Sequence, residues 1–310
     1  MLLAACSALL AAAALPPPPP AEKQGIQYGP MFVYLKLSPG ETGRQTFTLK
    51  NFSSRAVHLG IFRRDAWHDE QGGRLFPESG SVARGLGKWL SPPKSDRIRL
   101  AGHGEVNLDQ AVTVPAGALP GTFLGALMVR LETYEDEAGQ EESAARIHAG
   151  VKANSVVALL FHVDVKRPDG VLPAPEVEIV GQEVQPPTES TPLKVRLRLL
   201  NKSVWEVKPV GTLAVFDAEG RPAGKAAFDP LSIWPGQPLW VTANFTEILE
   251  PGKYRAFAAF SLEDPGDAQV IYPGPPVNRK LEFEVKPRES IPPRGAEPVR
   301  AGSKPDKQGT

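Results

Sequence analysis

The sequence of 310 residues lacks most of the features that mark a catalytic or metal-binding protein. Its single cysteine, Cys6, excludes an internal disulfide and a thiolate metal site. Its five histidines are scattered, at no spacing typical of a zinc site. The nucleophile elbow, the phosphate loop and the dinucleotide-binding fingerprint are all missing. We therefore predict a protein that is not an enzyme and that holds no metal and no cofactor.

Excess charge and long apolar segments are missing as well. Lysine and arginine number 35 and are balanced by 35 aspartates and glutamates, whereas a nucleic-acid-binding protein shows a clear basic excess. Beyond the N-terminal stretch, no apolar run reaches the roughly 18 residues that a transmembrane helix needs. We therefore expect no nucleic-acid partner, and contact with a membrane only through an N-terminal lipid.

The two ends differ in composition from the middle of the chain. Residues 1–21 consist of an apolar stretch and five consecutive prolines, which is typical of a signal peptide followed by a stiff spacer, although the usual positive n-region is missing. Residues 3–7 resemble a bacterial lipobox, which would make Cys6 a lipidated residue; the alternative is an ordinary cleaved signal. We expect an exported protein, periplasmic or on the cell surface, whose residues 288–310 form a disordered tail.

The middle of the chain contains a repeat. Residues 100–129 are echoed by residues 233–260: in both, a glycine-marked turn leads into a strand pattern, a loop, and a Leu-x-Pro-Gly turn before a further strand. A second echo joins the segments around Asn51 and Asn201. The many prolines and glycines fall between short apolar runs, as proteins rich in β-turns require. The fold class predicted is all-β, with two tandem immunoglobulin-like β-sandwich domains at about 25–168 and 173–287.

Individual strands show period-two alternation. In residues 44–51, Phe47 and Leu49 share one face, and in residues 192–200 four apolar residues alternate with cations. The longest such pattern runs from Ile147 to Val165, well beyond the ~5–6 residues of a typical strand. Two interpretations stay open: a core strand that bends near residue 154, or an exposed edge strand that pairs with a partner.

The order of these features resembles a known family. The segments SPGETGRQTFTLKN, WLSPPKSDRIRLAGHGEVNL, the strand after Pro120-Gly121, an acidic loop and a long alternating strand ending in Lys-Arg-Pro are similar to the first domain of periplasmic pilus-assembly chaperones. They also resemble the peptidoglycan-binding domain of the WxL-associated surface proteins of Gram-positive bacteria. The resemblance covers residues 28–285 and is carried by turn and core patterns.

The resemblance implies a function in binding other envelope or surface proteins. In the pilus chaperones, an edge strand of alternating apolar residues completes the sheet of a client subunit by β-strand addition. The matching residues here are Ile147, Ala149, Val151 and Ala153. Of the two basic anchors in the chaperone cleft, the first strand offers Lys36, while the last strand has Phe161 at the corresponding place. The alternative is a cell-surface adhesion module that binds peptidoglycan or another glycan.

The second half of the chain offers features for that alternative. Lys194, Arg196 and Arg198 could form a basic stripe, and Trp205, Trp234 and Trp240 could form a stacking platform for a sugar. A solvated sheet face explains the cations more simply, and core or edge packing explains the tryptophans more simply. The residues His68-Asp69-Glu70 are expected to face solvent in a loop rather than to bind a metal.

Overall fold

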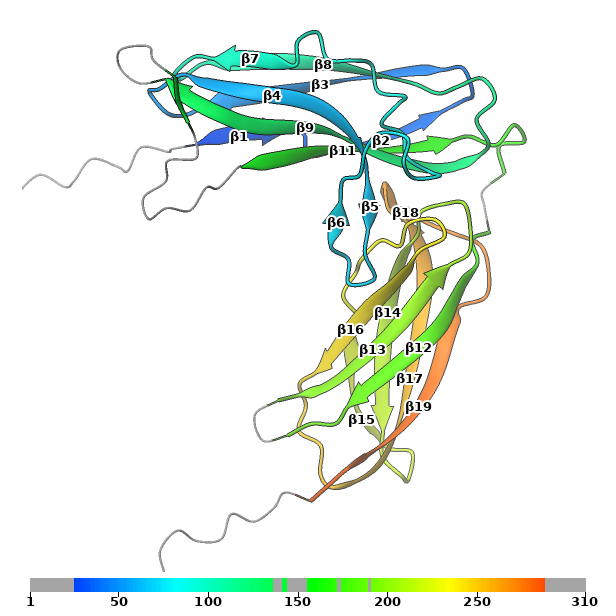
Figure 1. The fold of residues 1–310 in the computed structure, drawn as a ribbon. Coiled ribbons are helices and arrows are strands. Elements are labelled where there is room, and N and C mark those ends of the chain that lie inside the picture. The colour runs from blue at the N-terminus through cyan, green and yellow to red at the C-terminus, as the bar shows by residue number, and fades with distance from the viewer. Residues whose placement is uncertain (1–24, 136–140, 144–154, 172–173, 189–190, 288–310) are drawn as a thin grey trace, which may run out of the picture. The chain divides into compact units, whose positions relative to one another are not determined.

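The computed structural model describes residues 25–135, 141–143, 155–171, 174–188 and 191–287. Within these ranges, all regular structure is β-strand, and no helix is long and apolar enough to cross a membrane. The strands form β-sandwiches of the immunoglobulin-like kind, so the predicted all-β fold class is confirmed (Figure 1).

The chain divides into two compact units. Unit 1 contains the described parts of residues 1–66, 76–118 and 123–163. Unit 2 contains the described parts of residues 164–310, together with two short segments from earlier in the chain, 67–75 and 119–122. The sequence predicted boundaries near residues 168 and 173 and did not anticipate these two segments.

Unit 1 is built from two sheets. The first has the strand order β1 (Ile26–Gly29), β3 (Thr42–Asn51) and β8 (Glu105–Thr113). The second has the order β2 (Phe32–Leu37), β11 (Val156–Val165), β9 (Gly121–Glu135), β4 (Val57–Asp65) and β7 (Arg97–Leu100), with β10 (Glu141–Ser143) also paired to β9. The chain passes from one sheet to the other between β1 and β2, so that β1 pairs with β3 and β2 pairs with β11.

Alternation in the sequence explains the core of unit 1. Phe47 and Leu49 on β3 are fully buried, as predicted, while Thr46 and Thr48 use their hydroxyls to reach Asp109 and Asn107 on β8. Phe47 meets Phe161 of β11 in an edge-to-face contact, with ring centroids 5.3 Å apart. Phe161 therefore joins the two sheets and does not face a partner.

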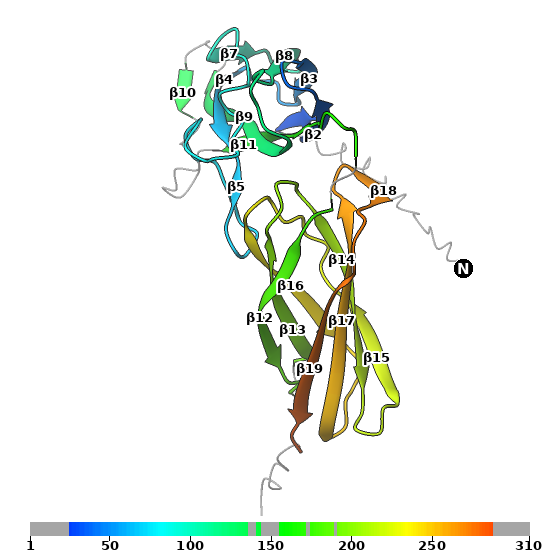
Figure 2. The same cartoon turned by 90° about the vertical axis from the view of Figure 1, so that its right-hand side faces the viewer.

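Unit 2 repeats this plan. One sheet has the order β12 (Val177–Gln185), β13 (Leu193–Asn201) and β16 (Pro238–Phe245). The other has the order β15 (Pro222–Ala227), β14 (Lys208–Phe216), β17 (Gly252–Asp264) and β18 (Asp267–Ile271), and β19 (Val277–Val285) pairs with β17 over residues 252–260 (Figure 2). The apolar residues predicted to point inward from β13 are all buried: Leu193, Val195, Leu197 and Leu199.

The repeat seen in the sequence is reproduced atom for atom at two buried asparagines. The amide of Asn51 donates to the carbonyls of Arg55 and Ala101, and its oxygen accepts from the backbone and hydroxyl of Ser53. Asn201 makes the same four bonds in unit 2, to Trp205, Ile233 and Ser203. Each asparagine thus ties the end of its strand to two loops.

Candidate functional site

An apolar strip on β2 and β11 is the most unusual surface of unit 1. The large hydrophobic side chains that are exposed among the described residues of this unit all lie on or beside these two neighbouring strands: Met31 (38 %), Phe32 (43 %), Tyr34 (44 %) and Val156 (42 %). Single exposed hydrophobics are ordinary, but a group confined to one place marks a binding surface. We call these four residues the edge strip.

The alternation of β2 creates the strip. Val33 and Leu37 point inward and are buried, so Phe32, Tyr34 and Lys36 must share the outer face of the same strand. Tyr34 is held there by His162 of β11, whose ring centroid lies 4.6 Å from its own. The strip is therefore fixed by packing on one side while its outer side meets solvent.

β2 covers only part of β11. The backbone N–H of Leu160 donates to the carbonyl of Met31, and Tyr34 lies against His162, so β2 advances along β11 in the same direction as the chain of β11 itself (Figure 1). β2 has six residues and β11 has ten, so β2 lies beside only the second part of β11. Residues 156–159 precede that part and lead back along the chain to segment 147–153.

Of the residues predicted for partner binding, some lie in the described part of the chain and others lie outside it. Lys36 is exposed on the outer face of β2, in line with Phe32 and Tyr34. Ile147, Ala149, Val151 and Ala153 lie outside the described residues, as does Cys6. Phe161 is fully buried. Within the described part of the long alternating pattern, β11 lies between β2 and β9, so its second half is an interior strand.

The cations predicted as a basic stripe in unit 2 are largely neutralised. Arg196 donates to Glu183 at 2.8 Å and stacks over the ring of Trp240, with 4.7 Å to its centroid. Arg198 is paired with Glu70. Trp205 and Trp234 are buried, which confirms core packing for these two residues. A polyanion or a sugar would therefore meet few free cations and few exposed indoles here.

His68 was expected to face solvent, and this expectation is wrong. The hairpin of β5 (Trp67–His68) and β6 (Arg74–Leu75) belongs to unit 2, where His68 is only 4 % exposed and lies 4.9 Å from the ring of Trp234. The N–H of Trp240 on β16 donates to the carbonyl of Glu70. The hairpin thus covers the edge of β16, which the local sequence could not reveal. Among the described residues, no cluster of histidine, cysteine and carboxylate side chains could hold a metal.

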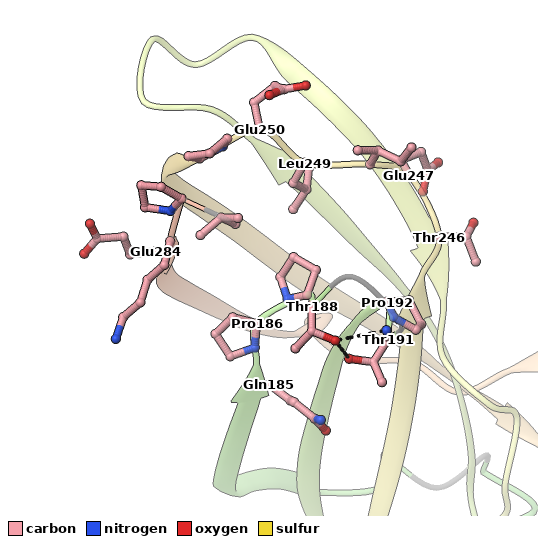
Figure 3. A pocket seen from close by; sticks show the side chains of 16 residues that line it. Gln185, Pro186, Thr188, Thr191, Pro192, Thr246, Glu247, Leu249, Glu250 and Glu284 are labelled. Atoms are coloured by element: carbon pink, nitrogen blue, oxygen red, sulfur yellow. Dashed lines mark hydrogen bonds between the residues drawn. The ribbon is translucent and has the colours of Figure 1, made fainter. Parts of the chain in front are cut away.

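A hollow lies at one end of unit 2 (Figure 3). Its lining residues lie at 185–188, 191–192 and 246–251 and at the end of β19 with the two residues after it, and they include five prolines. The hydroxyls of Thr188 and Thr191 are hydrogen-bonded at 2.6 Å, and the carboxylates of Glu247, Glu250 and Glu284 belong to the lining. Among the described residues, no histidine or cysteine lines the hollow.

Similarity to known proteins was found among solved structures. No family model and no curated protein matches the sequence. Among solved structures, the chain is similar to the Pseudomonas aeruginosa CupB2 chaperone (12 % identity, 84 % of this chain and 100 % of that chain, TM-score 0.40). It is also similar to the class 5 fimbriae chaperone CfaA (9 %, 85 % and 100 %, TM-score 0.42). A third is the Salmonella enterica SafA pilin in complex with the SafB chaperone (9 %, 84 % and 99 %, TM-score 0.39).

Proposed function

We propose that this chain is a non-catalytic protein of the bacterial envelope that binds other proteins, as an assembly chaperone or accessory factor does. The observation that carries the proposal is the edge strip, because unit 1 concentrates its exposed large hydrophobics there. The family resemblance of the sequence over residues 28–285 adds to it. Export, and a lipid on Cys6, stay predictions from the N-terminal sequence.

β-strand addition is the binding mode that fits this surface. Residues 156–159 of β11 precede the part of this strand beside which β2 lies. Before them in the sequence comes segment 147–153, in which apolar residues alternate. An unpaired strand edge offers backbone donors and acceptors to an incoming strand, and alternate side chains supply specificity. Phe32, Tyr34 and Val156 would then form an apolar floor beside the added strand.

The alternative, a module that binds glycans, receives less support. It needs exposed aromatic faces and accessible cations on unit 2, where two of the three tryptophans are buried and two of the three predicted cations are paired with carboxylates.

The test is retention of envelope proteins on the immobilised full chain, compared with Phe32→Asp and Val151→Asp. Phe257→Asp is the matched control, because the exposed fractions of Phe257 in unit 2 (44 %) and of Phe32 (43 %) are nearly the same. We expect each edge variant to lower retention roughly tenfold or more, since a carboxylate would be buried against an apolar strand. Hydrogen exchange with the retained partner should slow in peptides covering residues 147–160.

Equal retention by the parent and both edge variants would contradict the proposal, and so would an equal loss in Phe257→Asp. Selective elution by soluble peptidoglycan fragments would favour the alternative.

A further inference from the structure

Arg84 has no acidic partner among the residues that the structure describes. It lies in the loop between β6 and β7, in unit 1, with its side chain partly buried. Its Nη1 is buried and makes no hydrogen bond within the described part of the chain. Burial lowers the pKa of the Arg84 guanidinium, and no acidic neighbour opposes that shift. Burying a charged N–H donor that has no hydrogen-bond partner costs free energy, so the presence of an arginine at this position needs an explanation.

Aromatic rings form the wall behind this cation. The guanidinium carbon of Arg84 lies 5.1 Å from the ring centroid of Phe123, and the Trp89 ring lies 4.3 Å from the same ring at an angle of 39°. The N–H of Leu124 donates to the carbonyl of Arg84, which fastens the loop to the start of β9. The cation–π contact compensates part of the desolvation but satisfies no N–H donor.

Asp65 makes the loop rigid. Its carboxylate is fully buried at the end of β4 and accepts four backbone N–H bonds of 2.7–3.2 Å, from Gly80, Ser81, Val82 and Gly87. A Cβ placed on Gly85 would lie 2.1 Å from the Asp65 carboxyl carbon, so the loop fits closely around this group. The negative charge of Asp65 is therefore committed to the backbone, and Arg84 is presented on a preorganised support.

We propose that Arg84, backed by Phe123 and Trp89, is a binding site for a single carboxylate of a protein partner. This inference rests on the proposed function and names one chemical group of the partner. A guanidinium offers a planar pair of donors that matches a carboxylate, and a lone cation suits a monoanion better than a polyphosphate. The neighbouring rings favour a carboxylate that carries an apolar or aromatic group beside it. An acidic side chain and a chain terminus both provide this chemistry.

The experiment titrates the purified full chain with benzoate, with benzamide as the uncharged analogue, and follows the arginine Nε–H and tryptophan indole signals by NMR. We expect saturable shifts at Arg84 and Trp89 with benzoate and none with benzamide. Arg84→Gln should weaken binding at least roughly tenfold, and Arg84→Lys should weaken it less. Arg44→Gln is the control, because it removes the same charge from an exposed site on β3.

Two peptides distinguish the sources: acetyl-Ala-Phe with a free C-terminus, and acetyl-Asp-Phe-amide. Preference for the first assigns a chain terminus, and preference for the second an acidic side chain. Shifts that do not saturate, or that persist in a folded Arg84→Gln protein, would overturn the site, and so would equal binding of benzamide. Because no envelope partner takes part, a negative result here leaves the retention test of the proposed function unaffected.

Discussion

The outer strands of the two units differ in the side chains that they show to solvent. β2 of unit 1 presents Phe32 and Tyr34 on its outer face, followed by Lys36. The outer face of β19 in unit 2 presents Lys280, Glu282 and Glu284, the first two joined in an ion pair at 2.9 Å. Charges on an edge are the usual protection against unwanted strand pairing. β19 carries this protection and β2 carries apolar side chains instead, which supports a binding role for the β2 edge of unit 1.

The interiors of the two units are closely alike. Asn51 and Asn201 make the same four hydrogen bonds, and each is the last residue of a strand whose alternate residues are buried. The two units thus share contacts that maintain the fold and differ in the side chains of their outer strands.

Replacing the two buried asparagines tests whether the interiors of the two units are equivalent. Asn51→Ala and Asn201→Ala should each lower the free energy of unfolding by about 3 kcal/mol, because buried carbonyls and N–H groups lose their partners. Urea unfolding measures the lost free energy of unfolding, and hydrogen exchange shows in which unit each variant loses stability. Asn107→Ala, at an exposed position on β8, is the control and should cost about 0.5 kcal/mol or less. If one of the two buried substitutions proved neutral, the repeat would not be equivalent in the two units.

A second pair of substitutions removes the difference between the outer faces of β2 and β19. The double variant Lys280→Val with Glu282→Val gives β19 an apolar outer face, and we expect self-association to begin at a roughly tenfold lower concentration. Sedimentation velocity measures it. Moving the same two substitutions to Lys253, on the interior strand β17, and Glu247, in the loop between β16 and β17, leaves the composition unchanged and serves as the control. Unchanged sedimentation of the β19 variant would show that charge does not protect this edge.

The smallest effect concerns the hairpin of β5 and β6. In the folded chain, the Nδ1–H of His68 donates to the carbonyl of Asp69, and its Nε2 accepts from the N–H of Trp234 at 3.2 Å. These two hydrogen bonds require the neutral imidazole, because one ring nitrogen donates and the other accepts. Burial lowers the pKa of His68, while the nearby carboxylates of Glu206 and Asp69 oppose that shift. Below the unfolded pKa of 6.5, the unfolded chain therefore binds a proton that the folded chain resists, and stability falls as the pH falls.

We expect unit 2 to be about 1 kcal/mol less stable at mildly acidic pH than at neutral pH through this group, the value of one lost hydrogen bond. His68→Gln should flatten that dependence in urea unfolding, whereas His103→Asn, on an exposed turn of unit 1, should leave it intact. An unchanged pH dependence in His68→Gln would assign it to other groups.

Local pattern was enough for much of the fold. Alternation identified the buried faces of β3 and β13 because a strand repeats every two residues whatever its neighbours. Local pattern failed for His68 and Arg198, since their partners lie 166 and 128 residues away in the sequence. It also gave no sign that Asp65 is buried, because four backbone N–H groups from a distant loop decide its environment.

The amino-acid sequence was enough to predict that the chain is all-β, that it repeats one sandwich plan, and that it lacks the residues for disulfides and common catalytic motifs. These follow from composition, turn residues and period-two alternation, which act over a few residues. The three-dimensional fold was needed to show which strands are edges, which cations are paired and which aromatics are exposed. Those properties depend on which segments meet across the sheets, and the hydrogen bonds and packing that join them form between residues far apart in the chain.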